Sequence, residues 1–66
     1  MYVADYATIN LHGEATAVHS NKYYGICAWD SGKVIIHLPS NHNTSYNNRI
    51  EDRCTIRGGT ITNVED

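Results

Sequence analysis

Two apolar, strand-like runs joined by a short turn dominate the middle of the chain. Tyr23–Trp29 and Lys33–Leu38 are rich in β-branched and aromatic side chains, and Asp30-Ser31-Gly32 separates them. A three-residue loop of this kind is typical of an antiparallel hairpin whose glycine adopts a positive φ. The resulting register gathers six apolar residues on one side: Tyr24, Ile26, Ala28, Val34, Ile36 and Leu38. The sequence therefore predicts a central hairpin with one fully apolar face and with Gly32 in the left-handed region.

The C-terminal segment shows a similar pattern. Cys54–Arg57 and Thr60–Asn63 flank Gly58-Gly59, a pair that is typical of two-residue hairpin turns. Upstream, alternation places one set of residues inside, namely Ile50, Cys54 and Ile56. The same alternation places the other set outside, namely Arg49, Glu51, Arg53, Thr55 and Arg57. We therefore expect a second hairpin with an exposed arginine face.

The remaining segments are less regular. Residues 5–19 fit either a hairpin about Gly13 or an amphipathic helix, and their β-branched residues favour the hairpin. Residues 40–48 are rich in asparagine and follow the single proline, Pro39. Such residues favour turns, so we expect a long exposed loop with room for one helical turn near residues 45–49.

Three hairpins within 66 residues predict a single small β-rich domain, residues 1–66. The expected fold class is all-β, or α+β if one short helix is present. The expected architecture is a small antiparallel meander or barrel of about five to six strands, SH3-like or OB-like. A domain of this size buries only about 60% of its unfolded surface, which leaves a thin core. No internal repeat is expected.

Composition narrows the function classes. Charged residues make up 18% of the chain and the formal net charge is −2, which gives no global attraction to nucleic acid or to an anionic membrane. The N-terminal segment lacks the basic and apolar regions of a signal peptide, and no apolar run has the length of a membrane span. We therefore expect a cytoplasmic location. Cys27 and Cys54 would there be free buried thiols, although a bridge between them stays open.

Catalytic and metal-binding patterns are weak. His37 and His42 have a spacing seen in zinc sites, but no close cysteine pair accompanies them, because Cys27 and Cys54 are far apart. Nucleophilic chemistry by Cys27 with His37 lacks any local signature of an activated thiol. Serine-hydrolase and phosphate-loop motifs do not occur. We therefore expect no enzymatic activity, no metal and no cofactor.

A partner-binding surface fits the sequence better. The expected surface contains Tyr23, Trp29, Lys33 and His37, on the hairpin side that the apolar face does not use, because Trp and Tyr favour interface hot spots. A second layer that makes this side part of the core is the alternative. A further candidate is an acidic edge formed by Glu51, Asp52, Glu65 and Asp66, where like charges would face each other or a positively charged partner.

The expected function is a small non-enzymatic binding protein that inhibits or modulates a partner through protein–protein contact. Its size, compactness and lack of an enzymatic signature are typical of phage or mobile-element products, such as anti-CRISPR-like blockers of a host complex that handles nucleic acid. This expectation rests on the class of protein and on no single residue. The alternative is a small barrel that binds single-stranded nucleic acid. A homodimer is also possible at this size.

Overall fold

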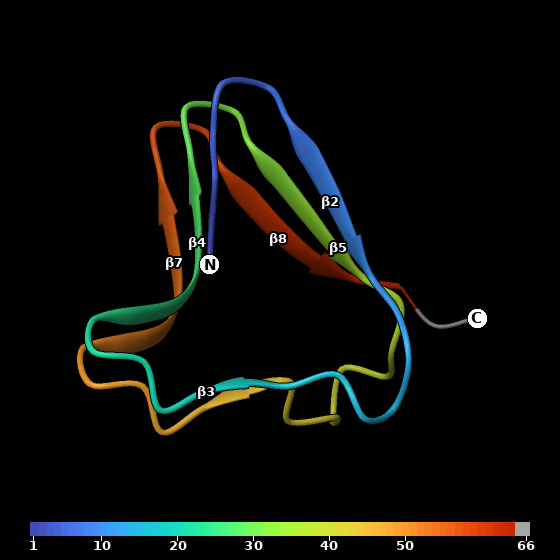
Figure 1. Cartoon of the computed structure of the whole chain (residues 1–66). Helices are drawn as coiled ribbons and strands as arrows, with labels where there is room; N and C mark the ends of the chain where they lie inside the picture. The colour runs from blue at the N-terminus through green and yellow to red at the C-terminus, as the bar shows by residue number, and fades with distance from the viewer. Residues whose placement is uncertain (65–66) are drawn as a thin grey trace.

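The chain forms a three-sided parallel β-solenoid (Figure 1). The computed structural model describes residues 1–64. Its strands are β1 (Tyr2–Val3), β2 (Thr8–Leu11), β3 (Val18–His19), β4 (Tyr24–Trp29), β5 (Lys33–Ile36), β6 (Ser45–Tyr46), β7 (Glu51–Ile56) and β8 (Thr60–Asn63). The three sides are the sheets β1-β4-β7, β2-β5-β8 and β3-β6, and every strand pair in them is parallel. Residues 1–64 contain no helix that could cross a membrane.

The chain passes these sides in three stacked turns, which we call coil 1 (residues 1–23), coil 2 (residues 24–50) and coil 3 (residues 51–64). Tyr2 pairs with Cys27 and Cys27 with Cys54, so these three residues occupy equivalent positions in successive coils. A structural repeat is therefore present where the sequence predicted none. The stack is flat, with extents of 28 × 28 × 14 Å.

The predicted antiparallel meander or barrel is wrong. β4 and β5 do not pair with each other, because each pairs with the equivalent strand of a neighbouring coil. Figure 1 shows them leaving a shared corner on two different sides of the solenoid. Parallel strands need a long crossover connection. The other two sides of each coil supply it, so the short turn only bends the chain.

The corner after β4 is a tight turn, but its conformation differs from the prediction. Asp30 and Ser31 have φ values of 48° and 64°, whereas Gly32 is not among the residues with positive φ. The amide of Gly32 donates to the carbonyl of Trp29 at 2.8 Å, which closes the turn. Coil 3 repeats this corner after β7, with positive φ at Arg57 and Gly58, so the predicted Gly58-Gly59 hairpin is also a corner between two sides.

Glycines 32 and 59 are needed for a different reason, the close approach of coils. A Cβ at Gly32 would lie 2.5 Å from the carbonyl oxygen of Val3 in coil 1. A Cβ at Gly59 would lie 2.0 Å from the carbonyl oxygen of Ala28 in coil 2. Both distances are far below van der Waals contact, so each glycine lets its corner stack directly on the preceding coil.

The other irregular segments also differ from the predictions. Residues 5–19 form neither a hairpin nor a helix, because β2 pairs with β5 and the chain then turns at Gly13, whose φ is 95°. The segment expected to be an exposed loop contains β6, and Thr44 and Ser45 within it are buried. No helical turn occurs at residues 45–49. Pairing of β6 with β3 satisfies its backbone, so this polar segment forms the third side of the solenoid.

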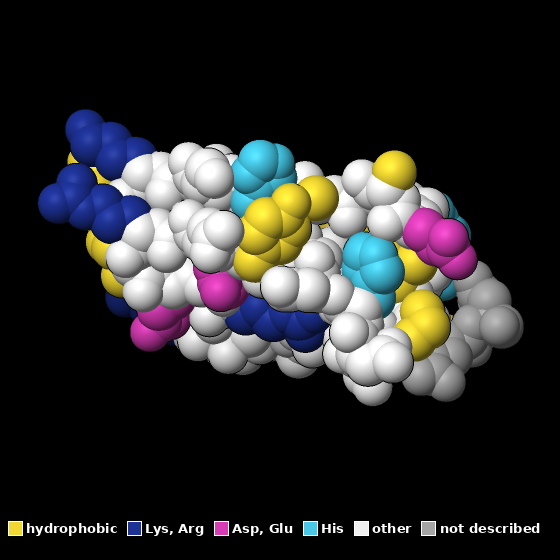
Figure 2. All heavy atoms as spheres, turned by 90° about the horizontal axis from the view of Figure 1, so that it is seen from below, with side chains coloured by type: hydrophobic (Ala, Val, Ile, Leu, Met, Phe, Trp, Pro, Cys, Tyr) yellow, Lys and Arg dark blue, Asp and Glu magenta, His cyan; other side chains and the backbone are white. Residues whose placement is uncertain are grey.

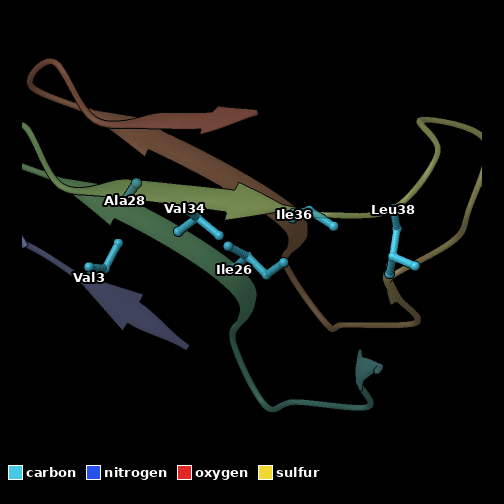
Figure 3. Close-up of a cluster of buried hydrophobic side chains, with 6 residues drawn as sticks. All are labelled: Val3, Ile26, Ala28, Val34, Ile36 and Leu38. Carbon is cyan, nitrogen blue, oxygen red and sulfur yellow. The ribbon is translucent and has the colours of Figure 1, made fainter. Parts of the chain in front are cut away.

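The core lies inside the solenoid, between the sides (Figure 3). Its buried residues are Val3, Ile26, Ala28, Val34, Ile36 and Leu38. Five of these were predicted to share one apolar face. They do pack together, but the side chains of β4 and β5 meet across the interior instead of lying side by side on one sheet. Tyr24, the sixth predicted member, is only half-buried.

Coil 3 places polar residues where coil 2 has its core. Arg53 pairs with Ile26 and Asn63 with Ile36, so both occupy positions that point inward in coil 2. Nη1 of Arg53 donates to Oδ1 of Asn63 at 3.1 Å, and Nδ2 of Asn63 donates to the carbonyl of Leu38 at 3.3 Å. These bonds cover the C-terminal end of the core with polar groups.

The predicted arginine face is therefore wrong. Arg53 lies over the end of the core, while Arg57 lies at the corner after β7 and pairs with Asp30 at 3.7 Å. Arg49 precedes β7, and its amide bonds to the carbonyl of Asn21. The residues of β7 that were predicted to face inward and outward are exchanged. Arg53 and Thr55 pair with Ile26 and Ala28, and this pairing makes them the inward positions.

We expect Gly59→Ala to destabilise the fold, because the new methyl group would strike the backbone of Ala28, which cannot move without breaking the stack. Overpacking of this kind costs about 1–3 kcal/mol, or a fall in Tm of at least about 4 °C in a domain of this size. Thermal unfolding followed by circular dichroism measures it. The neighbouring exposed change Thr60→Ala is the control and should shift Tm less; equal Tm values for both variants would contradict the close stacking of coils.

Candidate protein-binding face

The outer surface of the β1-β4-β7 sheet carries an aromatic cluster. An irregularity in β4 creates it, because Tyr24 pairs with Glu51 and Ile26 with Arg53, and the pairing skips Gly25. A Cβ on Gly25 would point at Oγ of Ser45, 2.1 Å away inside the solenoid. Gly25 and Ile26 thus both face inward, while the offset between β4 and β7 is the same on either side of Gly25, so no residue is inserted. The alternation shifts there, and Tyr24 faces outward with Tyr2 and Cys27.

We call this surface the tyrosine face and define it by Tyr2, Tyr23, Tyr24, Ile50 and Cys54. The rings of Tyr2 and Tyr24 meet edge to face, with centroids 6.3 Å apart. The amide of Ile50 donates to the carbonyl of Tyr23, so these two residues lie next to each other in neighbouring coils. Tyr2 is 57% exposed, and Tyr23 and Ile50 are each 53% exposed. The face therefore presents large groups to solvent from coil 1, namely Tyr2 and Tyr23, and from coil 2, namely Ile50.

Charges lie at the border of the tyrosine face and not within it. Nζ of Lys22 lies 5.4 Å from the ring centroid of Tyr23, a cation–π contact. Glu51 pairs with Tyr24 on the other side. Figure 2 views the β3-β6 side, where Lys and Arg side chains lie at the end nearest β4 and β7, beside hydrophobic side chains, and a further basic patch lies near the middle. An aromatic centre with a charged border is the usual composition of a protein interface.

Two free thiols lie beneath the tyrosines. Cys27 is fully buried in the column between Tyr2 and Cys54. A hydrogen bond to Cys27, together with desolvation, raises the pKa of the Cys54 thiol to about 11. Desolvation likewise raises the pKa of the Tyr2 hydroxyl. The thiol of Cys54 therefore stays protonated at neutral pH and is a weak nucleophile.

The sequence-predicted interface residues lie on different parts of the solenoid. Tyr23 is part of the tyrosine face. Trp29 ends β4 at the corner and is half-buried, and its Nε1 is buried with no hydrogen-bond partner among residues 1–64. Lys33 begins β5 on the next side, where it is exposed between Thr8 and Thr60. The structure thus separates Tyr23 from Lys33, because the predicted hairpin is a corner.

His37 directly follows β5, which belongs to a different side of the solenoid from the tyrosine face. Its ring stacks on His12 of coil 1, with centroids 4.1 Å apart and an interplanar angle of 10°. Its Nε2 lies 2.9 Å from Oδ1 of Asn10. Cys27 and His37 thus occupy different sides of the solenoid, so they do not form a nucleophile–base pair.

The predicted acidic edge falls partly outside the described residues, because Glu65 and Asp66 are not described. Glu51 borders the tyrosine face, but Asp52 belongs to a polar cluster. The backbone amide and Nδ2 of Asn48 donate to Oδ1 of Asp52 at 3.0 and 2.9 Å, and these bonds lower the pKa of the Asp52 carboxyl. Asp52 therefore has a structural role at the corner before β7.

Of the tyrosine-face residues, only Tyr23 was in the predicted interface. Tyr2 had no assignment, Ile50 and Cys54 were assigned to the inner side of the C-terminal segment, and Tyr24 was assigned to the apolar face of the central hairpin. The sequence signal that could have connected these residues is the number of residues in one coil, which separates Tyr2 from Cys27 and Tyr23 from Ile50. Residues 1–64 form no pocket and bring together no three His, Cys, Asp or Glu side chains as a metal site. No known protein family model, curated protein or solved structure is significantly similar to the chain.

The raised pKa of Cys54 predicts slow alkylation in the folded protein. At pH 8, a thiol of pKa about 11 is ionised about 100-fold less than one near 9, the ordinary value. Iodoacetamide labelling followed by mass spectrometry should show this difference between native and urea-unfolded protein. Because the folded-state pKa is raised, this thiol stabilises the fold below about pH 9, and the contribution is lost between about pH 9 and 11. Rapid labelling of native Cys54 at pH 8 would contradict the raised pKa of its thiol and its hydrogen bond to Cys27.

Proposed function

We propose that this protein is a non-enzymatic binding protein that acts through protein–protein contact and uses the tyrosine face as its binding surface. The observation that carries the proposal is the exposure of Tyr2, Tyr23 and Ile50 on one side of a rigid sheet. Tyrosines supply much of the binding energy of protein interfaces, and contiguous apolar groups on a surface mark partner sites.

The arrangement of the rings supports this proposal. The ring of Tyr2 packs against the ring of Tyr24, and the ring of Tyr23 contacts the ammonium group of Lys22. Side chains that are already ordered lose little conformational entropy on binding, which otherwise costs about 0.5–1.5 kcal/mol for each one. The tyrosine face is therefore suited to bind a partner with a flat complementary surface.

We further propose a more specific role, which the small size and the lack of an enzymatic signature suggest. The protein would be an inhibitor or modulator of phage or mobile-element type that acts in the cytoplasm on a host complex. This part rests on the class of protein, and anti-CRISPR-like blocking is one form of it. The alternative, binding to single-stranded nucleic acid, has less support, because only two basic residues of the described chain, Lys22 and Arg49, border the tyrosine face. Arg53 and Arg57 lie away from Tyr2 and Tyr24.

We expect Tyr23→Ala to weaken partner binding by about 2 kcal/mol, or roughly 30-fold, and to leave the fold intact, because this side chain is exposed. Affinity capture from an extract of the encoding cells, with quantitative mass spectrometry, identifies the partner, and titration calorimetry with it measures the loss. Tyr6→Ala is the matched control, since Tyr6 is 83% exposed at the corner between β1 and β2.

Equal binding by wild type, Tyr23→Ala and Tyr2→Ala would remove the tyrosine face as the site. A salt titration with single-stranded DNA and RNA tests the alternative, because nucleic-acid affinity falls steeply as salt rises. Strong, salt-sensitive binding to either strand would replace the protein-binding proposal.

A further inference from the structure

The two ends of the solenoid differ in chemistry. At the N-terminal end, the inward-facing side chains of coil 1 are apolar and half-buried, namely Met1, Ile9, Leu11 and Val18. At the C-terminal end, the positions equivalent to Ile26, Ala28 and Ile36 hold Arg53, Thr55 and Asn63, while Ile61 takes the position of Val34 and packs against the core. A solenoid needs a polar covering where stacking stops. Coil 3 has one and coil 1 does not.

The apolar end also carries unpaired backbone groups. β1 pairs only with β4 and β2 only with β5 among the described strands, so one edge of each is open. Open edges next to apolar side chains are templates for pairing with another chain. A partner must therefore offer both strand edges and an apolar surface of the same triangular outline. A second copy of coil 1 meets both requirements.

From this asymmetry we infer that the protein forms a two-fold symmetric homodimer, in which the N-terminal ends of two solenoids meet through coil 1. Such a dimer is closed, since each copy uses the same surface. The dimer surface is the end of the solenoid, whereas the tyrosine face of the proposed function is an outer sheet surface, and of the residues that define this face only Tyr2, on the edge strand β1, borders both. The outer sheet surfaces, including Tyr23 and Ile50, stay exposed in the dimer.

The competing arrangement, head to tail, conflicts with two features of the structure. It would bury the exposed Arg53 guanidinium against Ile9 and Leu11, and burial of an unpaired charge is strongly unfavourable. It would also stack coil 3 of one copy against coil 1 of the next, in the register that successive coils have within one copy. The corner of coil 1 has Ala7 where the next coils have Gly32 and Gly59, whose added Cβ atoms would strike the preceding backbone.

The size of the end sets the expected affinity. A triangle within the 28 × 28 Å extents has an area of about 400 Å², so a dimer would bury about 800 Å² as a flat projection, and side chains add to this. Interfaces of this size belong to weak complexes. We therefore expect a reversible dimer with a dissociation constant in the micromolar range.

Sedimentation velocity of the whole chain from about 10 μM to 1 mM tests the inference, with circular dichroism to check folding. Wild type should change from monomer to dimer and stop there. Leu11→Asp should weaken the dimer at least tenfold. Ala7→Glu should do the same, and because Ala7 is exposed this variant decides the matter if Leu11→Asp does not fold. Thr55→Asp, at the opposite end, is the matched control and should dimerise like wild type.

A wild-type protein that stays monomeric at 1 mM would overturn the inference. Unlimited assembly with rising concentration, or loss of association in Thr55→Asp and not in Ala7→Glu, would show head-to-tail stacking instead. Tyr23→Ala should leave the dimer unchanged, so failure of the dimer and failure of the tyrosine face are separate results.

Discussion

Backbone hydrogen bonds between successive coils are the interaction on which the rest of this structure depends. A strand of two to six residues has few partners within its own coil, so its amides and carbonyls are satisfied by the coils on either side. These bonds fix one register along each side, as in the column Tyr2, Cys27 and Cys54. Once the register is fixed, the choice of residues that face inward follows from it.

Close stacking also explains where the chain tolerates buried polar groups. Gly25 lies against Ser45 and Asn48, and there Oγ of Ser45 donates to the carbonyl of Asp52 at 2.6 Å. Oδ1 of Asn48 accepts from Nδ2 of Asn21 at 2.8 Å, so two asparagines in equivalent positions bond along the solenoid. Each polar group in this cluster thus has a partner, which is the condition for burying it at low cost. Polar bonds hold the corner between the β3-β6 side and the β1-β4-β7 side, because apolar packing is concentrated between the β1-β4-β7 and β2-β5-β8 sides.

The sequence allowed the elements to be predicted better than their arrangement. The strands around residues 24–29, 33–36 and 60–63 and the apolar set Ile26, Ala28, Val34 and Ile36 were found from local patterns, because alternation and turn residues act over a few positions. The antiparallel arrangement was wrong, because a tight turn between two strands specifies a change of direction but not which strand will supply the hydrogen bonds. That choice is made a whole coil away along the chain, by partners that no local pattern identifies.

A long-range signal was present but faint. Asn21 and Asn48 lie one full coil apart, and the same spacing separates Cys27 from Cys54 and Gly32 from Gly59. Coil 1 breaks this recurrence, because its spacing to coil 2 is shorter at β1 and β2 and because it has Tyr2 and Ala7 in the equivalent positions. With three recurring pairs of residues and one altered coil, no period stands out. The same alteration explains the incomplete prediction of the binding face, since Tyr2 joins Tyr24 only when coil 1 is stacked in its shifted register.

Stacking in register also organises the outer surface, and this connects the fold to binding. Side chains at equivalent positions form columns, as in the parallel rings of His19 and Tyr46, whose centroids lie 5.0 Å apart, and in the pair His12 and His37. Each ring is supported by the one in the next coil, so its rotamer is restricted before any partner arrives. A thin domain with a small core can thereby present ordered aromatic groups on a flat sheet. The same backbone ladder that stabilises the chain therefore also holds the tyrosines in the positions from which they can bind.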